Sequence, residues 1–314
     1  MKLSIIVTCY NRENYIERCI LSITHQLSRD VELIVINDGS TDRSLNILND
    51  LNQKHLFHIE TTPNRGVSAA RNKGIALSKG EYIWFIDGDD YICDSAVEKI
   101  LEATNSGFDV VIFNHTCKYG DIFMDEIALK NDLTDSSGLF KTEALYIWDK
   151  VFRRGVFQFI SFNESLTILE DAVLIMMASL HVEKVRTIPE VLYVYDRSDQ
   201  NSISRNQDNR HLIKLSQDSI YTHKLLLGYL HIVHNVNLKR IWEARLNNGF
   251  VGHIFSLVRF YNCRSVKRVI NVYRDWGVYP FKYYGSTKMK LFTFIVNHPK
   301  LWSLHRFVVR LIPS

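Results

Sequence analysis

Three aspartates close an apolar segment in the N-terminal third of the chain. Residues 82–86 are continuously apolar, and Asp87, Gly88, Asp89 and Asp90 follow directly. Such a run is typical of a strand buried on both faces of a parallel sheet, and ligands collect where these strands end. If the chain stays extended, Asp87 and Asp89 point to the same side. That pair suits Mg²⁺ or Mn²⁺ bound with substrate phosphates; a solvated Asp-Gly turn is the alternative.

The elements that must position these carboxylates alternate between strands and helices. Apolar runs predict strands at 3–8, 32–37, 56–60 and 82–86. Helical spacing predicts one helix from Asn11 to about 27, a second from the turn at 38–42 to about 52, and a third from Ser68 to 78. Asn11 and Ser68 are the expected N-caps. Short connections predict a mostly parallel α/β sheet with helices on both faces and right-handed crossovers.

Polar residues end three of these strands, at 8–11, at Asp38 and at 87–90. If those ends are neighbours, they line one crevice, which is where a nucleotide is expected in such a sheet. Neither a G-x-G-x-x-G after the first strand nor a P-loop sequence is present. A metal and side chains are therefore expected to contact the phosphates.

Five motifs, in order and spacing, resemble the family 2 glycosyltransferases of the GT-A fold, of the bacterial surface-polysaccharide type. They are residues 4–11 (SIIVTCYN), 35–42 (VINDGSTD), 64–74 (NRGVSAARNKG), 80–90 (GEYIWFIDGDD) and 170–171 (ED). The resemblance runs from Lys2 to about Ser204. It implies an inverting transferase that uses a UDP-sugar and Mn²⁺ or Mg²⁺. The family often has proline and a small residue where this chain has Thr8-Cys9, so Cys9 is given no role.

The resemblance also implies roles for single residues. Asp171 becomes the catalytic base and Asp89 the metal ligand, while the predicted donor-nucleotide site comprises Thr8, Tyr10, Asn11, Asp38, Arg71, Asp87 and Gly88. Lys150, in a segment resembling the family's aromatic-x-Lys-x-aromatic pattern, Glu170, and Arg197 beside the loop at 201–204 are further candidates. Each has a plain structural alternative: an Asx turn for Asp38, a solvated helix face for Arg71, a surface strand for 148–153, and offset of the helix dipole for Glu170 and Asp171.

Beyond Asp90 we predict a helix at 95–104, strands at 109–114 and 191–196, antiparallel pieces between 115 and 138, and a helix at 172–180. Helical patterns then recur at 212–230, 238–261 and 265–276. The expected division is a catalytic domain, 1–205, and a C-terminal helical region, 206–314.

The bulk composition narrows the class of protein. The net charge of +4 hides a basic tail, since the residues from Arg264 onward include ten Lys or Arg and a single acid. An apolar face at 301–312 and this charge predict peripheral contact with an anionic membrane; packing of that face on the body of the protein is the alternative. Five scattered cysteines predict neither disulfides nor a zinc site. No secretory signal or membrane-spanning run is expected, so we predict a cytoplasmic location at the inner face of a bacterial membrane.

The predicted activity is transfer of a hexose or N-acetylhexosamine from a UDP-sugar to a hydroxyl of a growing, lipid-linked surface glycan such as capsule, O-antigen or lipooligosaccharide, forming a β-linkage. A metal-dependent nucleotidyltransferase and a non-catalytic glycan-binding protein on the same scaffold are the alternatives. No RNP, KH or zinc-finger pattern supports nucleic-acid binding. The sequence leaves a homo-oligomer open.

Overall fold

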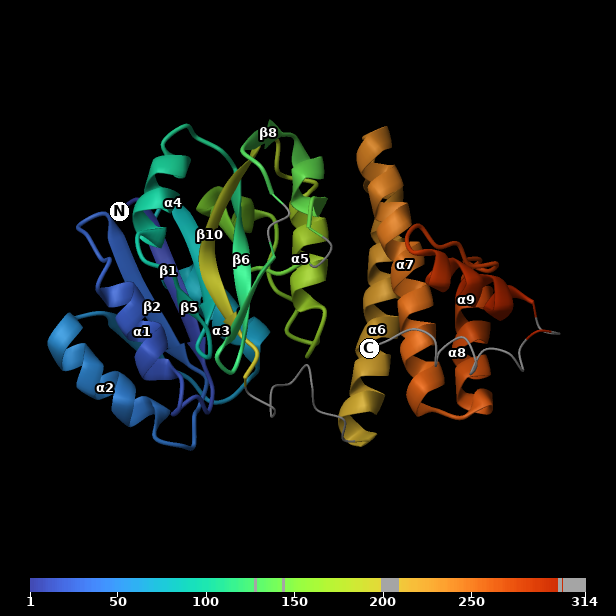
Figure 1. Cartoon of the computed structure of the whole chain (residues 1–314), viewed down its shortest axis with the longest axis horizontal. Coiled ribbons are helices and arrows are strands. Elements are labelled where there is room, and N and C mark those ends of the chain that lie inside the picture. The colour runs from blue at the N-terminus through green and yellow to red at the C-terminus, as the bar shows by residue number, and fades with distance from the viewer. Residues whose placement is uncertain (127–128, 143–144, 199–208, 299–300, 302–314) are drawn as a thin grey trace. The chain divides into compact units, whose positions relative to one another are not determined.

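The computed structural model describes residues 1–126, 129–142, 145–198, 209–298 and 301. The chain forms two compact units, Met1–Asp208 and Asn209–Ser314. The first is a sheet with helices packed on it, and the second is helical (Figure 1). The loop predicted at 201–204 and the helix predicted at 301–312, apart from Leu301, lie outside the described residues.

The first unit is built on one ten-stranded sheet with the main order β3-β2-β1-β4-β9-β6-β10-β5. Neighbours among β1, β2, β3 and β4 are parallel, as are β6 and β10. β7 and β8 pair in antiparallel fashion with β6 and β10. The strands are β1 (Leu3–Cys9), β2 (Val31–Asn37), β3 (His58–Thr61), β4 (Tyr82–Asp87), β5 (Tyr91–Ile92), β6 (Val110–Tyr119), β7 (Ile122–Glu126), β8 (Asp132–Thr134), β9 (Lys150–Arg153) and β10 (Val185–Asp196).

Helices cover both faces of this sheet, which confirms the predicted fold class. Successive residues of β1 enter different cores: Ile5 packs in one with helix residues such as Ile20, and Ile6 packs in the other with Leu174. This alternation follows from the period of two along a strand. The helices are α1 (Ile16–Thr24), α2 (Ser44–His55), α3 (Val67–Leu77), α4 (Ala96–Thr104) and α5 (Glu170–Ala178), with 3₁₀ turns η1 (Ser136–Phe140) and η2 (Arg154–Gln158).

Three local predictions were wrong. Asn11 does not cap α1, because it has a left-handed φ of 51° and its side chain accepts the Thr41 N–H at 2.8 Å, while the helix begins after Tyr15. Ser68 lies inside α3, whose N-cap is Gly66. Leu56 ends α2 in a left-handed conformation and does not begin β3. In each case a loop contact or backbone geometry outweighed the residue's average preference.

The segment around Lys150 is not a surface strand, which was the alternative interpretation of residues 148–153. β9 lies between β4 and β6 and is antiparallel to both, and Lys150, Val151 and Phe152 are buried. A short strand from a later part of the sequence therefore lies in the middle of the sheet and joins its two halves.

A close approach fixes the height of α3 above the sheet. A Cβ atom on Gly74 would lie 2.4 Å from Ile6 Cγ2 of β1, which is well inside contact distance. Glycine at this position lets α3 lie directly on β1. The same helix carries Arg71, so this contact also sets the position of that side chain.

The second unit contains α6 (Asn209–Tyr229), η4 (Leu230–Ile232), α7 (Val236–Phe260), α8 (Cys263–Asp275) and α9 (Thr287–Asn297). The helices predicted at 212–230, 238–261 and 265–276 are confirmed; α9 was not predicted. Their core includes Trp242, Phe250 and Tyr273, each about 1% exposed or less. Within the described residues, no helix has the length and apolar character that crossing a bilayer requires.

Candidate active site

The strand ends that carry the predicted site are neighbours, as expected. β1 lies between β2 and β4, with Cys9 opposite Asn37 and Thr8 opposite Asp87. The Gly88 N–H donates to the Thr8 carbonyl at 3.0 Å, and a Cβ on Gly88 would lie 2.8 Å from that oxygen. Glycine is therefore needed where the chain leaves β4. The polar residues that follow β1, β2 and β4 meet at one edge of the sheet.

Arg71 joins three carboxylates at this edge. Its Nη2 lies 2.9 Å from Asp87 Oδ1, and its Nη1 lies 2.6 Å from Asp171 Oδ1 and 3.0 Å from Glu170 Oε1. The Arg71 side chain is only 3% exposed, so it is no solvated helix face. Although burial opposes its charge, the three acids raise the pKa of Arg71. We call these four residues the Arg71 cluster.

Asp171 is held from two sides. Besides Arg71, the backbone N–H of Ile147 donates to its Oδ2 at 3.1 Å. Burial raises the pKa of both Asp171 and Glu170, while the charge of Arg71 lowers both. One guanidinium faces three acids, so the cluster carries excess negative charge whenever more than one acid is ionised. A carboxyl group with a raised pKa and fixed orientation is suited to accepting a proton.

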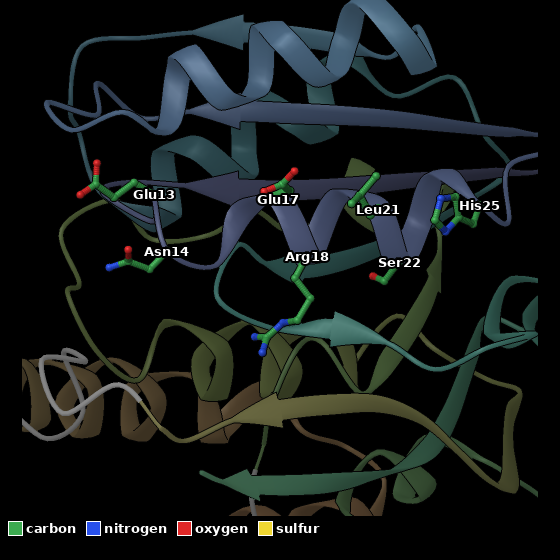
Figure 2. A pocket seen from close by; sticks show the side chains of 7 residues that line it. All are labelled: Glu13, Asn14, Glu17, Arg18, Leu21, Ser22 and His25. Carbon is green, nitrogen blue, oxygen red and sulfur yellow. The ribbon is translucent and has the colours of Figure 1, made fainter. Parts of the chain in front are cut away.

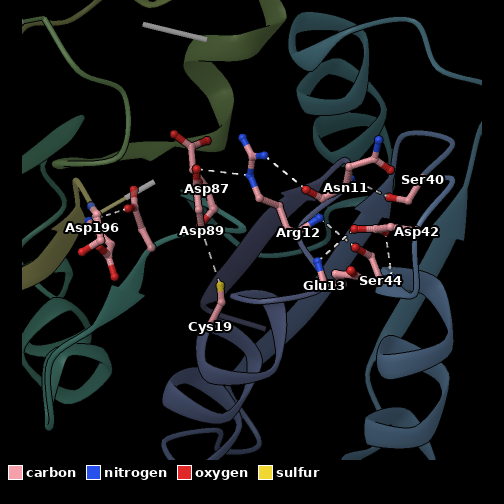
Figure 3. A network of polar contacts seen from close by, with 12 residues as sticks. Asn11, Arg12, Glu13, Cys19, Ser40, Asp42, Ser44, Asp87, Asp89 and Asp196 are labelled. Atoms are coloured by element: carbon pink, nitrogen blue, oxygen red, sulfur yellow. Dashed lines mark hydrogen bonds and ion pairs between the residues drawn. The ribbon is translucent and has the colours of Figure 1, made fainter. Parts of the chain in front are cut away.

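Asp89 pairs with another arginine, Arg12. The strand ends at Asp87, and the Asp90 N–H donates back to the Asp87 carbonyl in a turn. The chain is therefore not extended here, so the condition under which Asp87 and Asp89 were predicted to point to the same side is not met. Asp89 Oδ2 lies 3.1 Å from Arg12 Nε. Figure 3 follows this network from Asp89 through Arg12 to Asn11.

The donor atoms at this turn fit a hard divalent cation. Asp89 is a carboxylate with an 18% exposed side chain, and Asp87 lies two residues before it at the end of β4. Oxygen ligands of this kind are those that Mg²⁺ and Mn²⁺ prefer. A cation at Asp89 has to compete with Arg12, which already neutralises that carboxylate.

The remaining predicted donor-site residues lie on the loops after β1 and β2. The carboxylate of Asp38 accepts the backbone N–H groups of Arg65 and Gly66, at 2.9 and 2.8 Å, so it orders the loop before α3. Oδ1 also accepts the Thr62 hydroxyl at 3.5 Å, so the second lone pair of Oδ2 is the one left for a ligand. Asn11 bridges to the neighbouring loop at Thr41, and Tyr10 is 43% exposed.

Lys150 and Arg197 differ in their surroundings. Lys150 is fully buried, donates to the Tyr146 carbonyl and pairs with Asp149; its charge lowers the pKa of Asp171, so it lies near the cluster. Burial raises the pKa of Asp149 to about 6. Arg197 donates to the Tyr119 hydroxyl at 2.7 Å, at the end of β6. Contact of Arg197 with a diphosphate stays a prediction.

Two contributions to this site were not predicted. Arg12 directly follows the motif at residues 4–11. A basic side chain just after a predicted strand was the signal that could have indicated its role. Asp90 is buried and accepts the Tyr193 hydroxyl at 2.6 Å and the Asp196 N–H at 2.8 Å, so it fastens the turn to β10. Nothing in the local sequence indicates a partner more than a hundred residues away.

A separate hollow lies along α1 and the loop before it (Figure 2). Arg18 connects it to the site, since Nη2 donates to the Asp89 carbonyl at 2.8 Å and Nη1 to Asp196 Oδ2 at 2.7 Å. None of the predicted site residues lines this hollow. Its lining residues are Glu13, Asn14, Glu17, Arg18, Leu21, Ser22 and His25.

A mixed sheet with helices on both faces and carboxylates at its strand ends is the arrangement of the GT-A fold, which the solved structures below share. The family model described as "Glycosyl transferase family 2" matches residues 4–165. The chain belongs to this family, and it is a glycosyltransferase family 2 enzyme.

Similar proteins come from several bacteria. "Uncharacterized glycosyltransferase EpsJ" of Bacillus subtilis is 31% identical over 245 residues, which is 72% of this chain and 71% of EpsJ. "Poly(ribitol-phosphate) beta-glucosyltransferase" of Bacillus spizizenii is 25% identical over 96% of this chain and 48% of its own length. "Glycosyltransferase GlyA" of Streptococcus pneumoniae is 26% identical, and this chain spans 41% of it.

The fold has solved counterparts. The crystal structure of S. aureus TarS 1-349 in complex with UDP-GlcNAc has a TM-score of 0.64 with this chain at 17% identity. The match covers 99% of this chain and 91% of that one. At this identity the likeness concerns the fold.

Proposed function

We propose that this enzyme transfers a sugar from a UDP-sugar to a hydroxyl of a surface glycan, with inversion at the anomeric carbon. The observation that carries the proposal is the Arg71 cluster, in which the end of β4 and the start of α5 meet around one buried guanidinium. Fold does not choose the sugar, so the donor is named only by its nucleotide.

Asp171 is the proposed base. Arg71 and the Ile147 N–H orient its carboxylate. In an inverting transfer, a carboxylate on the face opposite the leaving UDP accepts the proton of the acceptor hydroxyl as that oxygen attacks. Lys150 and Asp149 form a buried ion pair behind this group and help to fix its surroundings.

The donor is proposed to lie across the ends of β1, β2 and β4. Asp38, Thr8 at the end of β1, and Tyr10 and Asn11 after it contact the nucleoside, while Arg71, Asp87 and Gly88 face the ribose, diphosphate or sugar. Asp89 is the residue proposed to hold Mn²⁺ or Mg²⁺, and such a cation supplies charge neutralisation of the departing diphosphate. A structural relative in complex with UDP-GlcNAc supports the choice of a UDP-sugar.

The acceptor is proposed to be a growing surface polysaccharide, because relatives bear the names poly(ribitol-phosphate) beta-glucosyltransferase and hyaluronan synthase. A lipid-linked glycan at the inner face of the cytoplasmic membrane fits the basic C-terminal segment. No observation favours a nucleotidyltransferase or a non-catalytic binding protein.

The Asp89 assignment predicts metal-dependent UDP binding. In titrations of the full chain, Mn²⁺ should strengthen UDP binding by about tenfold or more, and Asp89→Asn should remove that gain because the carboxylate is lost. Asp94→Asn, an exposed acid on the same segment, is the control. UDP affinity that is equal with and without Mn²⁺ in the unaltered protein would contradict the proposal.

The membrane contact predicts a charge effect. Replacing the exposed Lys282, Lys288 and Lys290 with Gln should weaken co-sedimentation with anionic liposomes, by about 1 kcal/mol for each lysine at the surface. The control is the same change at three exposed lysines of the first unit, Lys54, Lys79 and Lys99. Equal losses in both triple variants would count against a membrane-facing C-terminal segment.

A further inference from the structure

A second group of metal-type ligands lies on the β6–β7 hairpin. His115, Cys117 and Glu126 place one ligand atom each within 4.8 Å of the other two. His115 and Glu126 are direct partners in the antiparallel ladder, and Cys117 is two residues further along β6. The period of two along a strand therefore puts all three side chains on one face. No residue of the Arg71 cluster belongs to this group.

The separations match a tetrahedral site. His115 Nε2 lies 3.2 Å from Glu126 Oε2, and Cys117 Sγ lies 3.4 Å from Glu126 Oε1. Bonds of about 2.0 Å from zinc to nitrogen or oxygen and about 2.3 Å to sulfur, at tetrahedral angles, place ligand atoms roughly 3.3–3.6 Å apart. The two contacts use different oxygens of Glu126, so a shared cation requires a small rotation of this 55% exposed side chain.

The burial of His115 is a second observation. Its side chain is 5% exposed, and its Nε2 lies 3.2 Å from Glu126 Oε2 in poor hydrogen-bond geometry. A cation between these two atoms would satisfy a buried nitrogen that is costly to leave poorly bonded. The ring itself is fixed, because it packs edge-on against Trp148 with centroids 4.6 Å apart. Nε2 is thus held in place, directed at the other two ligand atoms.

We propose that His115, Cys117 and Glu126 bind one Zn²⁺ ion, with a water molecule or a further ligand at the fourth position. A thiolate and an imidazole favour Zn²⁺ over Mg²⁺ or Mn²⁺, which favour the oxygen donors at Asp89. A neutral histidine and two anionic ligands balance the charge of the ion. The site ties β7 to β6 beside the aromatic rings of Tyr146 and Trp148, which flank the Ile147 N–H bonded to Asp171.

Binding releases one proton. Burial raises the pKa of Cys117 to about 11, so the thiol is protonated in the metal-free protein, and the Zn–S bond forms as the S–H proton passes to water. Burial lowers the pKa of His115, which keeps its nitrogen lone pair available. The nearby Arg197 charge favours the thiolate. Cysteine spacing in the sequence could not indicate this site, because its ligands come from two paired strands and form no C-x-x-C pattern.

Co²⁺ titration of the reduced, chelator-treated full chain tests the proposal. About one equivalent should produce the near-ultraviolet thiolate-to-cobalt band and tetrahedral visible bands, and Zn²⁺ should remove them, whereas Mg²⁺ should not. Cys117→Ser should abolish the band. Glu126→Gln, whose parent side chain is 55% exposed and so dispensable for folding, should weaken Co²⁺ binding by at least about tenfold.

Two variants serve as controls. Cys263→Ser, in α8, and Asp89→Asn, at the proposed catalytic cation site, should both keep the band. The proposal is overturned if the unaltered protein gives no thiolate-to-cobalt band, or if the band survives in Cys117→Ser. Equal Co²⁺ affinity in Glu126→Gln and the unaltered protein would also overturn it.

Discussion

Replacing Asp171 with Asn should slow sugar transfer by about 10²–10⁴-fold while the protein stays folded, because loss of a positioned base has an effect of this size. The amide oxygen can still accept the Ile147 N–H, so the local backbone contact is retained. The measurement is UDP release from a panel of UDP-sugars, with UDP affinity determined in parallel. A role in catalysis predicts a large fall in rate and little change in UDP affinity.

Glu170→Gln is the matched control for Asp171→Asn. Both carboxylates contact Arg71 Nη1, and both stand in the first turn of α5. If the two variants lose the same amount of activity, the effect belongs to the Arg71 cluster as a whole and Asp171 is not the base. A UDP-release rate within a fewfold of the unaltered enzyme in Asp171→Asn would exclude that role directly.

Replacing Arg71 with Met should destabilise the first unit by about 3 kcal/mol, the lower end of the range for removing one partner of a buried ion pair. The lower end applies because Asp87, Glu170 and Asp171 keep 29%, 13% and 18% of their side chains exposed. Urea unfolding of the full chain at pH 7 measures the change. Arg65→Met, which removes a 67% exposed arginine that pairs with Glu164, should cost less than about 1 kcal/mol.

The pH dependence of the Arg71→Met effect identifies its cause. Without the guanidinium, burial raises the pKa of Glu170 and Asp171 further above their unfolded values. A group with a raised folded pKa destabilises the fold when ionised, and this penalty disappears as pH falls and the group is protonated. The difference from the unaltered protein should therefore shrink between pH 7 and pH 5. A difference that is independent of pH would indicate lost packing.

Local patterns were enough to predict the elements that bear the site. The apolar runs that became β1, β2 and β4 are continuous because these strands are buried on both faces, and their polar ends were visible in the sequence. The parallel order then brought those ends together, as the register of Thr8 with Asp87 confirms.

Pairings between distant residues could not be predicted in this way. Arg71 and Asp171 are 100 residues apart, and neither residue's neighbours indicate the other. The same holds for Asp90 and Tyr193. The turn from Asp87 to Asp90 and the pairing of Asp89 with Arg12 were not predicted either, because local alternation assumes an extended chain. Asn11 was assigned to a helix cap by average preference, whereas its side chain joins two loops.

The antiparallel strand β9 has a consequence for how the chain becomes a folded protein. β4 is flanked by β1 on one side, but its other side is paired only through Lys150–Arg153. During synthesis, the aromatic strand that ends in Asp87 therefore keeps an open edge until those four residues leave the ribosome. Exposed apolar edges of this kind invite pairing between chains. Nascent or truncated forms that stop short of residue 150 are thus expected to aggregate more readily than the full chain.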